Sequence, residues 1–459
     1  LLSAGFASGG HLEKALHHLV ETYPRDELYQ LTDDALYDNA MGILALGERK
    51  RLRLLTWADP FDRFVSCLVY VPRDAYSTDL RMKLQAILLN AFAGTRAEYD
   101  VQLGDATLAR IHFTVRTVPG QVPPWDRKAI EARLAAAARR WDDELSDALV
   151  EAEGEARGLE LLERFGRAFP LAYRERVAAR AAVADVRKLA ALTPEEPVAV
   201  ALVRPLGAPP DTLGFRIYRL GGAVALSDSL PMLERLGARV IGENNDHLTL
   251  PEGTRVALHD FVLQAQIPDA AEADEVARRF EHTFLLVLRG EVENDDFNRL
   301  VLRAGLQARE VVVLRAYAKY LKQIGFALSQ ATIEATLGRH ATIARMLVKL
   351  FQLRLHPTEH DDEAAAAQTR GLERALEKVE NLSEDRVLRQ LQALIECTLR
   401  TNFWRTGSGH SGAAGALRPF LSFKLDSARV PGLPAPRPMV EIFVYSPRFE
   451  GIHLRGGKV

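Results

Sequence analysis

Residues 52–71 read LRLLTWADPFDRFVSCLVYV, which is two apolar runs joined by a polar turn. The runs at 52–57 and 64–71 are rich in the β-branched and aromatic residues that strands favour. Asp59-Pro60 lies between them and is a turn signal. The segment therefore predicts two neighbouring strands.

A helix and a second pair of strands follow. Ser77 is placed to cap a helix that has one apolar face, which includes Leu84. Strands are then predicted near 99–103 and 109–115, and a long alanine-rich helix over 125–152. The order of elements is β-β-α-β-β-α.

The same order recurs downstream with little residue identity. The ferredoxin-like fold has the order β-α-β-β-α-β, and a circular permutation of that order gives β-β-α-β-β-α. The sequence therefore predicts two α+β units, each with a four-stranded antiparallel sheet. The elements of the second copy are strands at 198–203, 215–220, 239–241 with 248–250, and 256–265, and helices that begin at Ser227 and Glu272.

The remaining sequence changes character twice. Apolar spacing predicts helices from residue 295 to 400, interrupted at His356-Pro357, because the residue before proline avoids the helical conformation. Strands are predicted at 421–425, 440–445 and 452–454. The predicted fold class is α+β and multidomain. Its domains are a helical linker (1–50), an α+β unit (51–155), a helical linker (156–195), a second α+β unit (196–290), a helical domain (291–402) and a C-terminal β segment (415–459) that we expect to be truncated.

Composition excludes several function classes. The chain has 459 residues, and its net charge of −2 does not suit a nucleic-acid binder. It shows no apolar stretch of about 20 residues and no signal peptide. Cys67 and Cys397 lie in apolar surroundings, which predicts buried thiols and no disulfide. We expect a cytoplasmic protein with no membrane partner, cut out of a longer chain because it begins without Met.

No motif predicts a catalytic, cofactor or metal residue. Residues 407–412 read GSGHSG and match the dinucleotide fingerprint, but a predicted helix precedes them and a strand follows. The fingerprint requires the opposite order, so this segment is interpreted as a linker. His410 with Ser408 on one loop does not form an oriented triad. His11 and His17 lack the spacing of metal ligands.

Polar residues at predicted strand ends are candidates for binding a small ligand. A pocket there would need polar groups beside free backbone amides. Tight turns require the same residue types, so a structural role is the alternative. The candidates are Asp59, Asp62 and Arg63 in the first unit and Glu243, Asn244, Asn245 and Asp246 in the second.

Four stretches resemble the large NAD-specific glutamate dehydrogenases of bacteria. They are DPFDRFVSCLVYVPRD at 59–74, LGFRIY at 213–218, RAYAKYL at 315–321 and the closing stretch at 439–459. The last resembles the entry to that family's catalytic region. The similarity runs through essentially the whole chain.

The resemblance implies an enzyme that oxidises L-glutamate to 2-oxoglutarate and ammonia with NAD as cofactor. It also implies that the α+β units at 51–155 and 196–290 are ACT-like regulatory domains, whose polar candidates named above would bind an amino-acid effector. A homo-oligomer is implied as well. The family's substrate-binding, catalytic and NAD-binding residues would follow the last residue of this chain, so we expect none of them here. A free-standing amino-acid sensor and a helical assembly scaffold are the alternatives.

Overall fold

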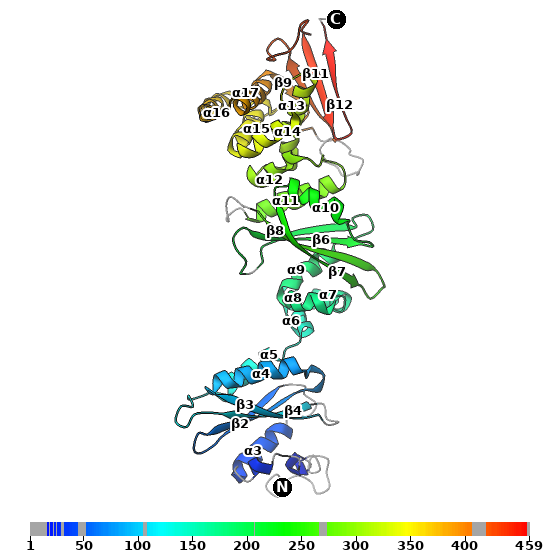
Figure 1. The fold of residues 1–459 in the computed structure, drawn as a ribbon. Coiled ribbons are helices and arrows are strands. Elements are labelled where there is room, and N and C mark those ends of the chain that lie inside the picture. The colour runs from blue at the N-terminus through cyan, green and yellow to red at the C-terminus, as the bar shows by residue number, and fades with distance from the viewer. Residues whose placement is uncertain are drawn as a thin grey trace. The chain divides into compact units, whose positions relative to one another are not determined.

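The computed structural model describes residues 16–17, 19–21, 23, 25–28, 32–44, 52–103, 108–205, 207–265, 273–405 and 419–456 (Figure 1). The chain divides into two compact units, residues 1–151 and 152–459. Each unit is described by itself.

The first unit contains a four-stranded antiparallel sheet. Its strands are β1 (Arg53–Ala58), β2 (Phe64–Pro72), β3 (Arg96–Gln102) and β4 (Leu108–Arg116), in the order β1-β2-β4-β3. The predicted strand pair around the Asp59 turn is confirmed, and so is the antiparallel sheet.

Helices cover both faces of this sheet. On one face α4 (Thr78–Ala91) and α5 (Arg127–Ala137) enclose a core that includes Cys67, which is fully buried as predicted. On the other face Leu68 packs against side chains of the N-terminal region that includes α3 (Asp33–Leu44). Burial from both sides explains why β2 is a continuous apolar run and does not alternate. Helix α2 (Arg25–Leu28) precedes α3.

The single helix predicted over 125–152 is wrong. The segment forms α5 and then α6 (Trp141–Glu153), separated by a short break. Ile130 on α5 belongs to the core of the first sheet, whereas Leu145 on α6 is buried outside that core. Acidic residues Asp142, Asp143 and Glu144 lie in the first turn of α6, where negative charge favours the start of a new helix.

The second unit begins with an equivalent sheet. Its strands are β5 (Val198–Val203), β6 (Thr212–Leu220), β7 (Arg239–Thr249) and β8 (Arg255–Gln264), in the order β5-β6-β8-β7. The predicted repeat of the fold is confirmed. In both sheets the first strand is an edge strand and the second and fourth strands are central.

One strand of this sheet differs from the prediction. The sequence predicts one strand from 239–241 with 248–250, with residues typical of tight turns between them, but β7 is continuous from Arg239 to Thr249. It pairs with β8 along its whole length, with one irregularity between Val240 and Gly242. Backbone pairing with a neighbouring strand outweighs the turn preference of Glu-Asn-Asn-Asp.

Helices also cover both faces of the second sheet. On one face α10 (Leu226–Arg235) and α11 (Ala273–Leu288) share the core with the sheet, and the rings of Phe215 on β6 and Phe280 on α11 lie 5.3 Å apart. The other face meets α9 (Ala179–Ala190), which follows α7 (Glu155–Phe165) and α8 (Leu171–Arg176) (Figure 1).

A helical segment follows, as predicted. The fully buried Tyr317 and Leu321 lie on α13, and α14, α15 and α17 all contact that helix. The elements are η4 (Asp296–Arg299), α12 (Leu300–Arg303), α13 (Ala308–Gln323), α14 (Gln330–Arg339), α15 (Ala341–Leu355), α16 (Asp362–Leu376) and α17 (Leu382–Cys397).

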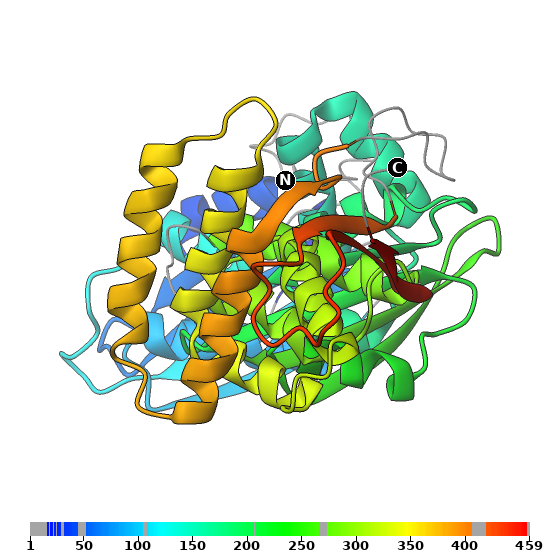
Figure 2. The same ribbon diagram turned by 90° about the horizontal axis from the view of Figure 1, so that it is seen from above.

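A third antiparallel sheet ends the described chain. Its order is β12-β11-β10-β9, and α17 lies beside it (Figure 2). The three predicted strands are confirmed. Residues 398–400, predicted to be helical, instead begin β9, because Thr398 and Arg400 pair with β10. The strands are β9 (Thr398–Thr401), β10 (Leu421–Asp426), β11 (Val440–Ser446) and β12 (Phe449–Arg455).

Candidate regulatory sites and the contact with the C-terminal sheet

The β1–β2 turn holds the first group of candidate effector residues. The Asp59 carboxylate accepts hydrogen bonds from the Arg63 side chain at 2.8 and 2.9 Å and from the backbone N–H groups of Phe61 and Arg63. Asp62 has a φ of +54°, a turn conformation that Asp tolerates. The structure brings these residues together, but Asp59 already satisfies its oxygens within the turn.

The Asp59 pair gives a pH-dependent prediction. Its hydrogen bonds with the Arg63 side chain lower the pKa of Asp59 from the ordinary value of 3.8 to about 2. A carboxyl group with a depressed pKa in the folded state stabilises that state above pH 3.8, and this contribution is lost as the pH falls toward 2. Asp59→Asn should therefore lower the thermal midpoint of the first unit at pH 7, by an amount that shrinks between pH 4 and pH 2.

The neighbouring Asp62→Asn is the matched control, because Asn also tolerates a positive φ. Thermal unfolding followed by circular dichroism over this pH range measures both variants. A pH-independent difference between Asp59→Asn and the unsubstituted chain would contradict the ion-pair explanation.

The second group of candidates lies inside β7 and does not converge on one point. Side chains alternate along a strand, so Glu243 and Asn245 face one side of the sheet, and Asn244 and Asp246 the other. The Glu243 carboxylate lies 2.9 Å from Nδ1 of His259. Asp246 pairs with Arg176. Effector binding by this group stays a prediction, but the geometry now requires two separate sites.

A buried polar network joins the second sheet to α8 and α9. Asp185 is fully buried on α9 and lies 2.6 and 2.7 Å from the Arg216 guanidinium on β6. The hydroxyls of Tyr173 and Tyr218 also donate to Asp185. Arg216 reaches Asp260 at 3.3 Å. Burial of the hydroxyls, together with the Asp185 charge, raises the pKa of both tyrosines, which keeps them protonated as donors.

Sequence reasoning did not find this network. Asp185 lies alone in an alanine-rich helix, and its partners are 12 to 33 residues away. The stretch at 213–218, quoted for its family resemblance, contains two of the partners, Arg216 and Tyr218. The physical role of that stretch is therefore to bind the Asp185 carboxylate on α9.

The stretch at 315–321 has a comparable role at the third sheet. Arg315 is fully buried and forms two 2.7 Å hydrogen bonds with the Asp295 carboxylate and one with Asn298. Lys319 lies 3.1 Å from Glu293, which also accepts a hydrogen bond from Tyr445 on β11. These contacts hold the segment before α13 against both α13 and the C-terminal sheet.

The two tyrosines of the same stretch contact the sheet directly. The ring of Tyr317 stacks on Phe423 of β10 at a centroid distance of 4.1 Å, and its hydroxyl lies 2.8 Å from Oγ1 of Thr398 on β9. The Tyr320 hydroxyl donates to Glu441 on β11. About one turn of helix thus contacts three of the four strands through side chains.

The described part of the chain gives little support for a metal site or a membrane-spanning segment. Within it, no group of three or more His, Cys, Asp or Glu side chains is arranged to hold a metal ion. Of the described helices, none is both long and apolar enough to cross a bilayer. The segment at 407–412 and His11 lie outside the described residues.

Six family models match consecutive parts of the chain. Their descriptions all name glutamate dehydrogenase, and together they follow the order of the observed elements. They are helical motif 1 (1–49), the ACT2 domain (53–142), helical motif 2 (148–192), the ACT3 domain (197–276), helical motif 3 (292–357) and the catalytic domain of bacterial NAD-glutamate dehydrogenase (371–459).

Curated relatives agree with these models. Over 99% of the chain, it is 41% identical to the NAD-specific glutamate dehydrogenase of Halomonas elongata and 38% identical to that of Pseudomonas aeruginosa. The chain belongs to the NAD-specific glutamate dehydrogenase family. It is also 37% identical to the Mycobacterium tuberculosis protein of that name over 98% of its length. The chain spans 28% of the length of each of these relatives.

The family models place the contacts described above between named parts of a glutamate dehydrogenase. The Asp185 network joins helical motif 2 to the ACT3 sheet, and the 315–321 stretch joins helical motif 3 to the catalytic-domain match. That match begins at residue 371, inside α16, so it includes α17 and all four strands of the third sheet.

Proposed function

We propose that the chain is the regulatory and assembly portion of an NAD-dependent glutamate dehydrogenase, together with the start of its catalytic region. The whole enzyme converts L-glutamate and NAD to 2-oxoglutarate, ammonia and NADH. The observation that carries the proposal is the joint made by residues 315–321, which attaches the third sheet to the helical segment through buried side chains. A free-standing sensor would not need this attachment.

The described residues do not fit NAD. A dinucleotide site uses a parallel β-α-β unit, with the pyrophosphate at the N-terminus of the crossover helix. The three sheets of the described chain are antiparallel. We therefore place the NAD site, and with it the catalytic core, in the part of the enzyme that corresponds to the remaining length of the relatives.

This proposal predicts that the 459-residue chain alone does not oxidise glutamate. Hydride transfer requires cofactor and substrate to be held in contact, and we place the groups that do this outside the chain. The measurement is NADH absorbance after glutamate and NAD are added to the purified chain. A polypeptide extended to the full length of the relatives should turn over and is the positive control. NADH formation by the shorter chain, above a heat-treated sample, would place the catalytic core inside it.

We further propose that the enzyme is cytoplasmic and forms homo-oligomers through its ACT-like and helical parts. One edge strand of each ACT-like sheet supports the second point, because a strand edge offers backbone groups to a partner: β3 is largely exposed and β7 is partly exposed. Amino-acid binding near Asp62 or Asn244 remains part of the same regulatory proposal.

A further inference from the structure

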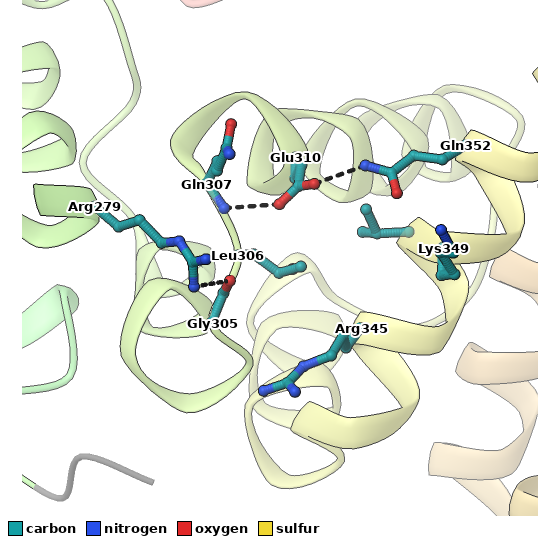
Figure 3. Close-up of a pocket in the computed structure, with 9 residues that line it drawn as sticks. Arg279, Gly305, Leu306, Gln307, Glu310, Arg345, Lys349 and Gln352 are labelled. Atoms are coloured by element: carbon teal, nitrogen blue, oxygen red, sulfur yellow. Dashed lines mark hydrogen bonds between the residues drawn. The ribbon is translucent and has the colours of Figure 1, made fainter. Parts of the chain in front are cut away.

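A cavity of about 170 Å³ lies where α11, the loop before α13, and α15 meet (Figure 3). Three cations line it: Arg279 from α11, and Arg345 and Lys349 from α15. We call this cavity the basic pocket. It connects the last helix of the second ACT-like unit with the helical segment.

Positive charge in the basic pocket is poorly neutralised. The lining holds these three cations and one carboxylate, Glu310, whose oxygens accept hydrogen bonds from neutral groups, the backbone N–H of Gln307 at 2.8 Å and the Gln352 amide at 2.7 Å. Among the described residues, Arg345 and Lys349 have no carboxylate partner within ion-pair distance. Arg279 alone pairs with an acid, Glu275.

The two guanidinium groups are held close together by backbone carbonyls. Arg279 donates to the carbonyl of Gly305 at 2.8 Å, and Arg345 donates to the carbonyl of Ala304 at 2.7 Å. A Cβ on Gly305 would lie 3.3 Å from one guanidinium and 3.4 Å from the other. The positive φ of Gly305 lets the chain turn tightly at this point (Figure 3). Two like charges at one glycine favour an anion that lies against both.

A second cavity shows that this charge imbalance is not general. It has a volume of about 480 Å³ and lies beside α15 and α16, and its lining contains three arginines and three acidic residues. Its charges balance, so it has no such preference for an anion. Size therefore does not single out the basic pocket, but charge does.

We propose that the basic pocket binds a small dianionic metabolite, one that carries a phosphate group or two carboxylates. The ligand bridges Arg279 on α11 to Arg345 and Lys349 on α15. It therefore favours the arrangement in which the ACT-like unit and the helical segment are held together. This inference rests on the proposed function for its regulatory meaning, but not for the binding itself.

The test is calorimetric titration of the 459-residue chain at constant ionic strength. The probes are inorganic phosphate and succinate, which separate the phosphate from the dicarboxylate source, and L-arginine serves as a cationic control. We expect saturable binding of phosphate, succinate or both, and none of arginine. In the double variant Arg345→Gln/Lys349→Gln the binding should weaken about tenfold or more, because two charged donors are lost.

A second double variant, Arg289→Gln/Lys322→Gln, is the matched control. It removes the same charge from exposed positions on neighbouring elements outside the basic pocket, and it should bind as the unsubstituted chain does. Circular dichroism melts check that both variants fold. No binding of either anion, or equal weakening in both double variants, would overturn the proposal. Selective weakening in the pocket variant, with no glutamate oxidation by the extended enzyme, would keep the site and reject the proposed function.

Discussion

Asp185→Ala should destabilise the second unit by about 3–5 kcal/mol, the cost of removing one partner from a buried ion pair. The side chain is fully buried and is the shared acceptor for Arg216, Tyr173 and Tyr218. Its loss removes the closer of the two carboxylates that Arg216 contacts, leaving Asp260 at 3.3 Å, and leaves two buried hydroxyls without their acceptor. Asp185→Asn should cost less, because the amide oxygen still accepts hydrogen bonds although the charge is gone.

Hydrogen exchange followed by mass spectrometry measures this effect locally, which matters because a chain of two units does not unfold in one step. We expect faster exchange in α9 and β6 and unchanged exchange in β2 of the first unit. The matched control is Glu160→Ala, which removes an exposed carboxylate that pairs with Arg157 at 2.7 Å. That change should cost less than about 1 kcal/mol. Equal effects of the two alanine variants would show that the network does not hold α9 in place.

Local sequence patterns predicted the elements that depend mainly on neighbouring residues in the chain. The apolar run of β2 and the cap at Ser77, whose hydroxyl accepts from the Leu80 N–H, needed no knowledge of distant residues. The repeated order of elements then predicted both antiparallel sheets. The errors occur where a distant partner decides, as in β7, whose turn-forming residues are held extended by β8.

The candidate sites show the same division more strongly. The sequence predicted the polar turn at Asp59 correctly, and the structure shows that the Arg63 side chain donates two hydrogen bonds to the Asp59 carboxylate. It did not indicate a role for Asp185, Arg315 or Arg345, because the partners that define each role lie on other elements. The family resemblance included two of the relevant stretches, 213–218 and 315–321. The structure shows why their polar residues are needed: they bind buried partners on other elements.

Arg315 is the second position where we expect a large effect. Arg315→Ala should destabilise the contact between α13 and the preceding segment by about 3–5 kcal/mol, since Asp295 would lose its buried bidentate partner. Arg315→Lys keeps the charge but cannot form both hydrogen bonds, so an intermediate loss of about 1.5–3 kcal/mol is expected. Lys322→Ala, on an exposed turn of the same helix, is the matched control and should be nearly neutral.

The consequence should reach the third sheet. Arg315 holds the segment that carries Glu293, and Glu293 accepts the hydrogen bond from Tyr445 on β11. Loss of Arg315 should therefore speed hydrogen exchange in β11 as well as in α13, while Lys322→Ala leaves both unchanged. If α13 loosens and β11 does not, the tyrosine contacts of Tyr317 and Tyr320 suffice to hold the sheet. In that case the hydrogen bond between Glu293 and Tyr445 does not help to hold the third sheet on the helical segment. Any conformational change in the ACT-like units then reaches the sheet through Tyr317 and Tyr320.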